Sequence, residues 1–507
     1  MSRRAELLTV ASLLLAAMLA AAALTDHGIL FTRPLWLDEY HTVLVAERGT
    51  PAQVVRDLAH GADLAPPLLH LVVWTARHVI GSLTATWLHV LSFLAVWGAL
   101  VFVAASLRRR FDVISSVAGA VAVASNSVVV SHTFEARYYG PWLLFAAFLA
   151  WSFGVDDERA SSHRRDWLIG VASVLLCTIH WFGVLTWTLA VAAAAACHRE
   201  RIRRLAPALA GPVATVICSP LLFMQRSLFT TPIWVPDLNA TQVMDMGREF
   251  YLTVVPVLAA ALWLASTFRD EVPASSPGRR PLMRDASIVA LVAFGLMPVV
   301  VTLVSWLVQP TMLPRYAIAA ALAWAPLAAF ACAWLGRTPR ILWCALLGAL
   351  AWVHVRGEAA TKRAFADDVA ADVQAFDQAR PTGIPIVFET RHVLYPVAAL
   401  RAAARDSMAL LVMPDALLDA MFPAASPVRD MGRFFRFEHD AVRLHVAAYG
   451  FPALRTVAAL DSLPRFLLLA RDASLPRGYK DAALFGRAVF PTFRVVRLRE
   501  NLVLFTR

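Results

Sequence analysis

The chain has 507 residues, of which 59% are hydrophobic and only 16% are charged. Soluble domains are roughly 45–50% apolar and about 25% charged, so a mean hydropathy of +0.60 excludes an ordinary soluble enzyme. The formal net charge is +11, and nearly all of the basic residues are Arg. Because Arg in loops sets membrane topology, we interpret this excess as a topology signal and predict no nucleic-acid partner.

The apolar residues are gathered into blocks of about 17 to 25 residues, the length that a helix needs to cross a bilayer. The sequence therefore predicts a polytopic α-helical membrane protein with about 11 transmembrane helices and a transmembrane domain at 1–355. The predicted spans are 7–24, 85–107, 113–130, 138–154, 167–181, 183–197, 206–224, 250–267, 286–308, 316–335 and 341–355.

Arg clusters occupy every second loop between these spans. Cytoplasmic loops carry the excess of Lys and Arg, so these loops are expected on the cytoplasmic side and the Arg-poor loops outside. The clusters are Arg3 with Arg4, Arg108 to Arg110, Arg159 with Arg164 and Arg165, Arg199 to Arg204, Arg269 with Arg279, Arg280 and Arg284, and Arg337 with Arg340.

One apolar segment, 66–80, is shorter than a membrane-spanning helix and contains His70, Arg77 and His78. Counting it as a crossing would place the cluster at 108–110 outside and break the alternation of every later loop. We therefore predict an amphipathic helix lying in the outer interface. The first outer loop then covers 25–84, which is long enough to indicate a functional role.

The hydropathy falls after the last span, and the segment 356–507 is long enough to bury a core of its own. Strand-like runs at 384–388, 408–413, 466–470 and 489–505 alternate with helical patterns at 366–379 and 393–404. This alternation predicts a C-terminal extracytoplasmic α/β domain.

Two adjacent carboxylates, Asp38 and Glu39, lie just after the first span, at the expected outer interface. In such a pair, one acid can serve as a general base or a metal ligand while the other positions it. The alternative is an ordinary acidic helix N-terminus, where carboxylates are favourable.

Two Arg-Tyr pairs lie in loops where the positive-inside bias gives no reason for Arg. Arg137 and Tyr138 follow Glu135 in the second outer loop, and Arg315 and Tyr316 precede a late span. A guanidinium binds phosphate with two parallel hydrogen bonds, so these pairs are candidate phosphate ligands. The alternative for the first pair is a snorkelling Arg137 bound to Glu135.

Two histidines are expected on the same side of the membrane. His180 lies at the end of the fifth span, and His70 lies in the interfacial helix. An interfacial His is a functional candidate, although one beside Trp is as often a packed residue. The five cysteines show no metal-ligand spacing.

These residues, in this order, resemble the polyprenyl-phosphate-dependent membrane glycosyltransferases of the GT-C class, in particular bacterial relatives of protein O-mannosyltransferases and of the lipid A aminoarabinose transferase. The resemblance covers about 1–355. It rests on the acidic pair, the Pro-Pro-Leu stretch at 66–68, both Arg-Tyr pairs and the histidine at the end of the fifth span. Relatives often carry a soluble outer domain of variable fold in place of the segment 356–507.

The resemblance implies that Asp38 is the base that deprotonates an acceptor hydroxyl, with inversion at the anomeric carbon. Glu39 would orient Asp38 or help to hold a divalent metal ion. The donor phosphate would be bound by Arg137, Tyr138, Arg315, Tyr316 and His180, with Glu135 and His70 as possible substrate or metal support. Relatives often have His before Pro-Pro where Ala65 stands here, so metal use stays open.

The implied partners are a polyprenyl-phosphate-linked sugar, membrane lipids, and a glycan, lipid or protein as acceptor. The implied location is the bacterial cytoplasmic (inner) membrane, with the site and the C-terminal domain facing the periplasm. Two other classes stay open: a transporter or flippase of lipid-linked glycan, which would place ionisable residues at the midplane, and a polysaccharide polymerase or ligase. A noncatalytic scaffold is a further alternative.

Overall fold

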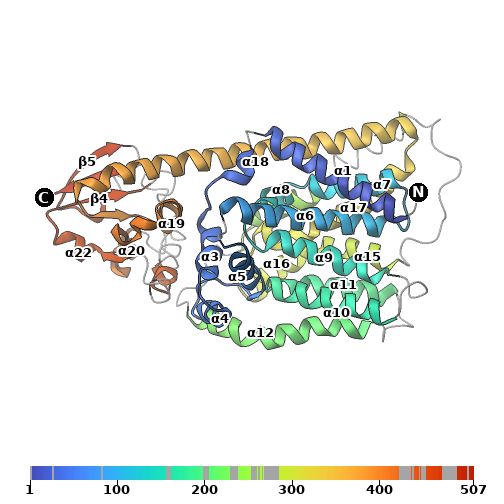
Figure 1. Ribbon diagram of the computed structural model, residues 1–507, viewed down its shortest axis with the longest axis horizontal. Coiled ribbons are helices and arrows are strands. Elements are labelled where there is room, and N and C mark those ends of the chain that lie inside the picture. Colours follow the sequence, from blue (N-terminus) through green and yellow to red (C-terminus); the bar gives the residue numbers. More distant parts are fainter. Residues whose placement is uncertain are drawn as a thin grey trace.

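The computed structural model describes residues 3–25, 28–81, 84–155, 162–197, 205–228, 238–252, 285–421, 453–470, 488–499 and 502–507, with a few further positions in 260–267 and 436–446. The chain is a polytopic α-helical membrane protein with an α/β region at its C-terminal end (Figure 1). The first part is a bundle of long helices, and the second is built around one sheet.

Among the described residues, six helices are long and apolar enough to cross a membrane, or seven if one bent pair counts as a single span. The bent pair is α7 (Val113–Ala124) and α8 (Ser127–Thr133), which meet at 74°. The other bundle helices are α1 (Arg3–Leu24), α6 (Ala85–Leu107), α9 (Tyr139–Phe153), α10 (Ser162–Ile179), α11 (Gly183–Cys197), α12 (Ala210–Ser227), α15 (Ala286–Ala293), α16 (Met297–Leu307), η7 (Pro314–Ala323), α17 (Trp324–Trp334) and α18 (Arg337–Ala379).

These helices coincide with ten of the predicted spans, apart from shifted ends. The remaining predicted span, 250–267, falls largely outside the described residues, where only η3 (Arg248–Leu252) at its start is placed as an element. One difference is the length of α18, which has 43 residues and continues far beyond the predicted span at 341–355. It runs along the bundle and on to the C-terminal domain (Figure 1), so helical backbone joins the two parts.

Ion pairs bring Arg clusters from distant loops to one end of the bundle. Arg108 pairs with Glu6 at 2.6 Å, and Arg110 pairs with Asp285 at 2.9 Å. Arg340 pairs with Asp112 at 3.1 Å, so the first residues of α15 and α18 lie at the same end as the start of α1. This grouping agrees with the predicted alternation of Arg-rich and Arg-poor loops.

The predicted first outer loop is folded into short helices at the opposite end of the bundle. They are α2 (Ile29–Thr32), α3 (Leu37–Ala46), α4 (Pro51–Ala59) and α5 (Leu68–Ile80). The predicted helix at 66–80 is therefore confirmed as α5, with His70 on its buried face and Val79 80% exposed. Helix α3 lies across the ends of the long helices instead of running beside them (Figure 1).

The C-terminal domain contains a six-stranded sheet in the order β3-β2-β1-β4-β6-β5. Strands β1 to β4 are parallel to their neighbours in that order, and β6 and β5 add an antiparallel edge. The strands are β1 (Ile386–Phe388), β2 (Met408–Val412), β3 (Ala453–Thr456), β4 (Arg465–Leu469), β5 (Arg494–Arg499) and β6 (Leu502–Thr506). The expected α/β character is confirmed.

Three details of this domain differ from the prediction. The run at 489–505 contains two strands, β5 and β6, which pair with each other. Strand β3 was not predicted, because its residues are mostly exposed and lack an alternating apolar pattern. The helix predicted at 366–379 is the end of α18, while the one at 393–404 corresponds to α19 (Arg391–Leu400).

Candidate active site

Asp38 and Glu39 occupy the first turn of α3, where a helix N-terminus favours negative charge. Successive side chains on a helix point about 100° apart, so the two carboxylates face different surroundings. The side chain of Asp38 is 25% exposed, whereas that of Glu39 is fully buried. Only Asp38 is therefore open to a substrate.

Glu39 is held by four separate groups. Arg33 makes a two-pronged ion pair with it at 2.7 Å for each nitrogen, and His89 Nε2 lies 3.1 Å away. The backbone N–H groups of Ala136 and Trp36 donate to it at 2.8 and 3.0 Å. Burial acts to raise the pKa of Glu39, but Arg33 and His89 outweigh it and hold the pKa well below its usual range. Glu39 is a permanent anion that fixes α3 against the second outer loop.

Arg137, expected as a phosphate ligand, is bound to a residue that the sequence analysis did not single out. Its two terminal nitrogens lie 2.5 and 3.2 Å from the carboxylate of Asp63. His70 Nε2 contacts the same carboxylate at 3.1 Å. Arg137 Nη1 also donates to the backbone oxygen of Asp38 at 2.8 Å. Arg137 therefore connects the loop of Asp63 to the first turn of α3.

Asp63 is kept ionised by these contacts. Burial acts to raise its pKa, but Arg137 and His70 outweigh burial and hold the pKa well below its ordinary value. The alternative in which Arg137 pairs with Glu135 is wrong, because its carboxylate partner is Asp63. The sequence signal that could have found Asp63 is an acid in the long outer loop, shortly before Pro66 and Pro67.

Gln225 on α12 holds the loop that carries Asp63. Its amide nitrogen lies 3.0 to 3.1 Å from the backbone oxygens of Leu58, Asp63 and Ala65. Gln225 is 1% exposed, so these contacts replace water around three loop carbonyls. A polar residue directly after the predicted span at 206–224 is the signal that could have identified it.

Arg315 is the cation beside the exposed acid. Its Nη1 lies 3.7 Å from Asp38 Oδ2, and its side chain is 17% exposed. The guanidinium carbon also lies 5.6 Å from the ring centre of Tyr316 and 5.9 Å from that of Tyr139. Aromatic rings beside a guanidinium fix its position, so Arg315 is held where it can reach the same space as Asp38.

His180 lies in an aromatic cluster between α10 and α11. Its ring stacks on Trp142 at 4.7 Å, with Tyr138 at 4.4 Å and Tyr316 at 5.5 Å. Its Nδ1 accepts a hydrogen bond from the backbone of Phe182 at 3.2 Å. His180 is thus neutral, and Nε2 is its remaining donor.

Glu135 faces a different part of the molecule. It lies 2.5 Å from His132 Nδ1 and 3.4 Å from Lys362 on α18. Burial acts to raise the pKa of Glu135, but His132 and Lys362 lower it to about 2. Glu135 therefore ties the second outer loop to α18 and takes no direct part in the group around Asp38.

The residues around Asp38 do not fit a divalent metal ion. Metal sites of this kind use several oxygen ligands, but the Glu39 carboxylate is fully engaged and Asp63 is bound to Arg137 and His70. Within the described ranges, no group of three or more His, Cys, Asp and Glu residues could hold an ion. The charged neighbour of Asp38 is a guanidinium, which would oppose a cation.

The C-terminal domain packs directly on α3. Tyr40 from α3 and Tyr395 from α19 lie 5.3 Å apart between ring centres, in a hydrophobic cluster that also contains Leu37 and Leu44. Arg405 lies 5.6 Å from the ring of Tyr40. One side of the helix that carries Asp38 is therefore part of the core of the C-terminal domain.

Comparison with solved structures identifies the fold. The chain is similar to ArnT from Cupriavidus metallidurans in the apo state, with 12% sequence identity and a TM-score of 0.58 over 97% of both chains. It is also similar to ArnT bound to undecaprenyl phosphate, with 12% identity and a TM-score of 0.55 over 99% of this chain and 98% of that one. No family model and no curated protein sequence matches the chain. Since ArnT is a GT-C lipid A aminoarabinose transferase, the chain has a GT-C-like fold over nearly its whole length.

Proposed function

We propose that the protein is an inverting glycosyltransferase that moves a sugar from a polyprenyl-phosphate donor to an acceptor hydroxyl at the outer face of the cytoplasmic membrane. The observation that carries this proposal is the pairing of Asp38, a partly exposed carboxylate, with Arg315 at 3.7 Å. Attack by an acceptor hydroxyl requires a base, and departure of a phosphate requires a cation. The two groups must therefore lie close together, as Asp38 and Arg315 do.

In the proposed reaction, Asp38 accepts the proton of the acceptor hydroxyl. The hydroxyl oxygen forms a bond to the anomeric carbon, and the bond from that carbon to the phosphate oxygen breaks with the electron pair leaving on the phosphate. Arg315 stabilises the negative charge of the departing lipid phosphate. A single displacement of this kind inverts the anomeric configuration and needs no covalent intermediate.

The remaining charged residues have positioning roles in this proposal. Glu39, with Arg33 and His89, holds the first turn of α3. Arg137 braces the backbone of Asp38 and is itself held by Asp63. Arg137 was expected as a phosphate ligand, and we assign it instead to the support of α3, because its terminal nitrogens are engaged in the described structure.

Ring-bearing side chains beside Arg315 complete the proposed binding site for the donor phosphate. The Tyr138 hydroxyl lies 3.4 Å from Arg137 Nη2 and is able to donate a hydrogen bond. We propose that Tyr138, Tyr316 and the neutral His180 contribute hydrogen bonds and packing around the phosphate, while Arg315 supplies the charge. The neighbour ArnT was solved with undecaprenyl phosphate bound, which supports a lipid phosphate of this class.

The experiment is transfer of radiolabelled sugar by the purified protein in lipid vesicles, using a panel of synthetic polyprenyl-phosphate sugars and candidate lipid, glycan and peptide acceptors. Wild type is compared with Asp38→Asn and Arg315→Gln. Asp377→Asn serves as the matched control, because it removes a carboxylate from an exposed ion pair with Arg401 in the C-terminal domain.

Donor-dependent transfer that disappears in Asp38→Asn and persists in Asp377→Asn would support the proposal. Movement of a labelled lipid-linked glycan across the vesicle membrane, without sugar transfer from any donor, would overturn it in favour of a flippase. Extension of a lipid-linked polysaccharide that continues undiminished in Asp38→Asn would instead indicate a polymerase or ligase with another site.

A further inference from the structure

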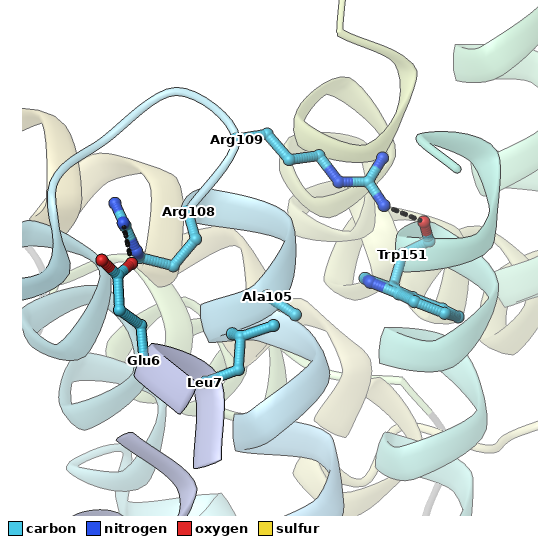
Figure 2. A pocket seen from close by; sticks show the side chains of 6 residues that line it. All are labelled: Glu6, Leu7, Ala105, Arg108, Arg109 and Trp151. Atoms are coloured by element: carbon cyan, nitrogen blue, oxygen red, sulfur yellow. Dashed lines mark hydrogen bonds and ion pairs between the residues drawn. The ribbon is translucent and has the colours of Figure 1, made fainter. Parts of the chain in front are cut away.

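We propose that a cavity at the Arg-rich end of the bundle, far from Asp38, binds the head group of a phospholipid that carries a phosphodiester and a primary ammonium. Figure 2 shows this cavity, which has a volume of about 150 Å³. Three elements contribute to it: the start of α1, the end of α6 with the turn that follows, and the end of α9. The lining residues are Glu6, Leu7, Ala105, Arg108, Arg109 and Trp151.

The position of the cavity matches the level of the lipid head groups. The lining residues lie where α1 begins and where α6 and α9 end, among the clustered Arg residues expected on the cytoplasmic side. Directly beyond Leu7, the side chains of Leu8 and Leu13 are 66% and 61% exposed. A helix with large apolar side chains exposed at this depth faces lipid, so the cavity is next to acyl chains.

Two guanidiniums are held in place on different sides of the cavity. Arg108 donates to the backbone oxygen of Phe111 at 2.6 Å and pairs with Glu6 at 2.6 Å. Arg109 donates to the backbone oxygen of Trp151 at 3.1 Å, on the other side of Leu7 and Ala105 (Figure 2). The hydrogen bonds to these backbone oxygens fix both guanidiniums in place, and a fixed guanidinium is well suited to a phosphate oxygen.

The mixture of charges favours a zwitterionic ligand. The carboxylate of Glu6 would repel a head group that is only anionic, but it attracts an ammonium. A phosphate near Arg108 and Arg109 with a primary ammonium near Glu6 satisfies both signs. Leu7 and Ala105 are apolar and suit the carbon atoms next to the phosphate.

Gly154 offers a way to test the geometry without changing any charge. A Cβ atom at this position would lie 1.6 Å from Arg109 Nη1, so the guanidinium must move in Gly154→Ala. The atom that it meets is the end of a flexible side chain, so the backbone of α9 need not shift. The neighbouring Arg110 provides the matched control, because it belongs to the same cluster but pairs with Asp285 and does not line the cavity.

The experiment uses the full chain, equilibrated with vesicles of equal phosphatidylethanolamine, phosphatidylcholine and phosphatidylglycerol, and then purified in mild detergent. Native mass spectrometry counts the lipids retained. We expect one retained phosphatidylethanolamine per wild-type chain, at least tenfold less retention in Gly154→Ala and Arg109→Gln, and wild-type retention in Arg110→Gln. In Glu6→Gln the preference for phosphatidylethanolamine over phosphatidylglycerol should be lost.

Three results of the lipid-retention measurement would overturn the proposal. The first is equal lipid retention in wild type and Gly154→Ala, and the second is equal retention of all three lipids by wild type. The third is a loss in Arg110→Gln as large as that in Arg109→Gln, which would indicate only a diffuse attraction to the Arg cluster. A parallel sample with inorganic phosphate separates a head-group site from a simple phosphate site. Undiminished lipid retention in excess phosphate supports the former, and full displacement contradicts it. Sugar transfer is not measured, so this test is independent of the proposed function.

Discussion

Asp38 and Glu39 are adjacent in the chain, yet Asp38 lies 3.7 Å from Arg315 with a quarter of its side chain exposed, while Glu39 is completely buried against Arg33. The pair is therefore divided into an accessible acid and a structural one. Several measurable consequences depend on this division and on the way in which α3 is held.

Substitution of the two acids should produce different losses. Asp38→Asn removes the proposed base but no buried contact, so we expect the transfer rate to fall by about 10²-fold or more, with the thermal unfolding midpoint nearly unchanged. Glu39→Gln should lower the unfolding midpoint as well, because Arg33 is left buried without its anion. Initial rates and thermal unfolding in detergent measure both effects. Equal stability losses in the two variants would contradict the division.

The Arg33 and Glu39 pair should show strong coupling. Removal of one partner of a buried ion pair costs about 3–5 kcal/mol, because the other charge is left without compensation. We therefore expect Arg33→Met and Glu39→Met each to destabilise more than half as much as the double variant. A double-mutant cycle on the free energy of unfolding checks this. Additive losses would mean that the two residues act separately.

Acid should weaken the attachment of the second outer loop to α18. The pKa of Glu135 is about 2 in the folded chain against an ordinary 4.5. A lowered pKa means that this stabilisation is complete above about pH 4.5 and is lost as the pH falls toward 2. The shift corresponds to about 3 kcal/mol in total, of which His132 contributes more than Lys362 on α18. Unfolding measured between pH 6 and 2 should show a smaller decline in Glu135→Gln, and an identical decline would contradict the assignment.

Packing of the C-terminal domain on α3 should affect both stability and rate. Tyr395→Ala removes a buried ring from the contact with Tyr40, and loss of a large buried aromatic costs about 3–5 kcal/mol. We expect a lower unfolding midpoint and a lower kcat, because the first turn of α3 loses its support. Leu400→Ala, at a 47% exposed position of the same helix, is the control. A wild-type rate in Tyr395→Ala would show that α3 is positioned by the bundle alone.

Much of the architecture could be predicted from local sequence patterns. The predicted span at 183–197 agrees with α11. The short segment at 66–80 was predicted to be a helix that does not cross the membrane, and it forms the helix α5. Strand β3 was missed because an exposed edge strand carries little hydrophobic signal. Of the candidate site residues, the structure brings Asp38, Arg137, Arg315 and Tyr316 together, while Glu135 lies with Lys362.

The sequence by itself determined the membrane class, the alternation of Arg-rich loops and the acidic pair at the start of the first outer loop, because hydropathy and charge act over short stretches of chain. Only the tertiary structure decided which charges pair. Arg137 binds Asp63 from 74 positions away, and Glu39 binds His89 from 50 positions away. Local patterns leave many such pairings possible, and the choice among them depends on which buried charges the folded helices bring within hydrogen-bond distance.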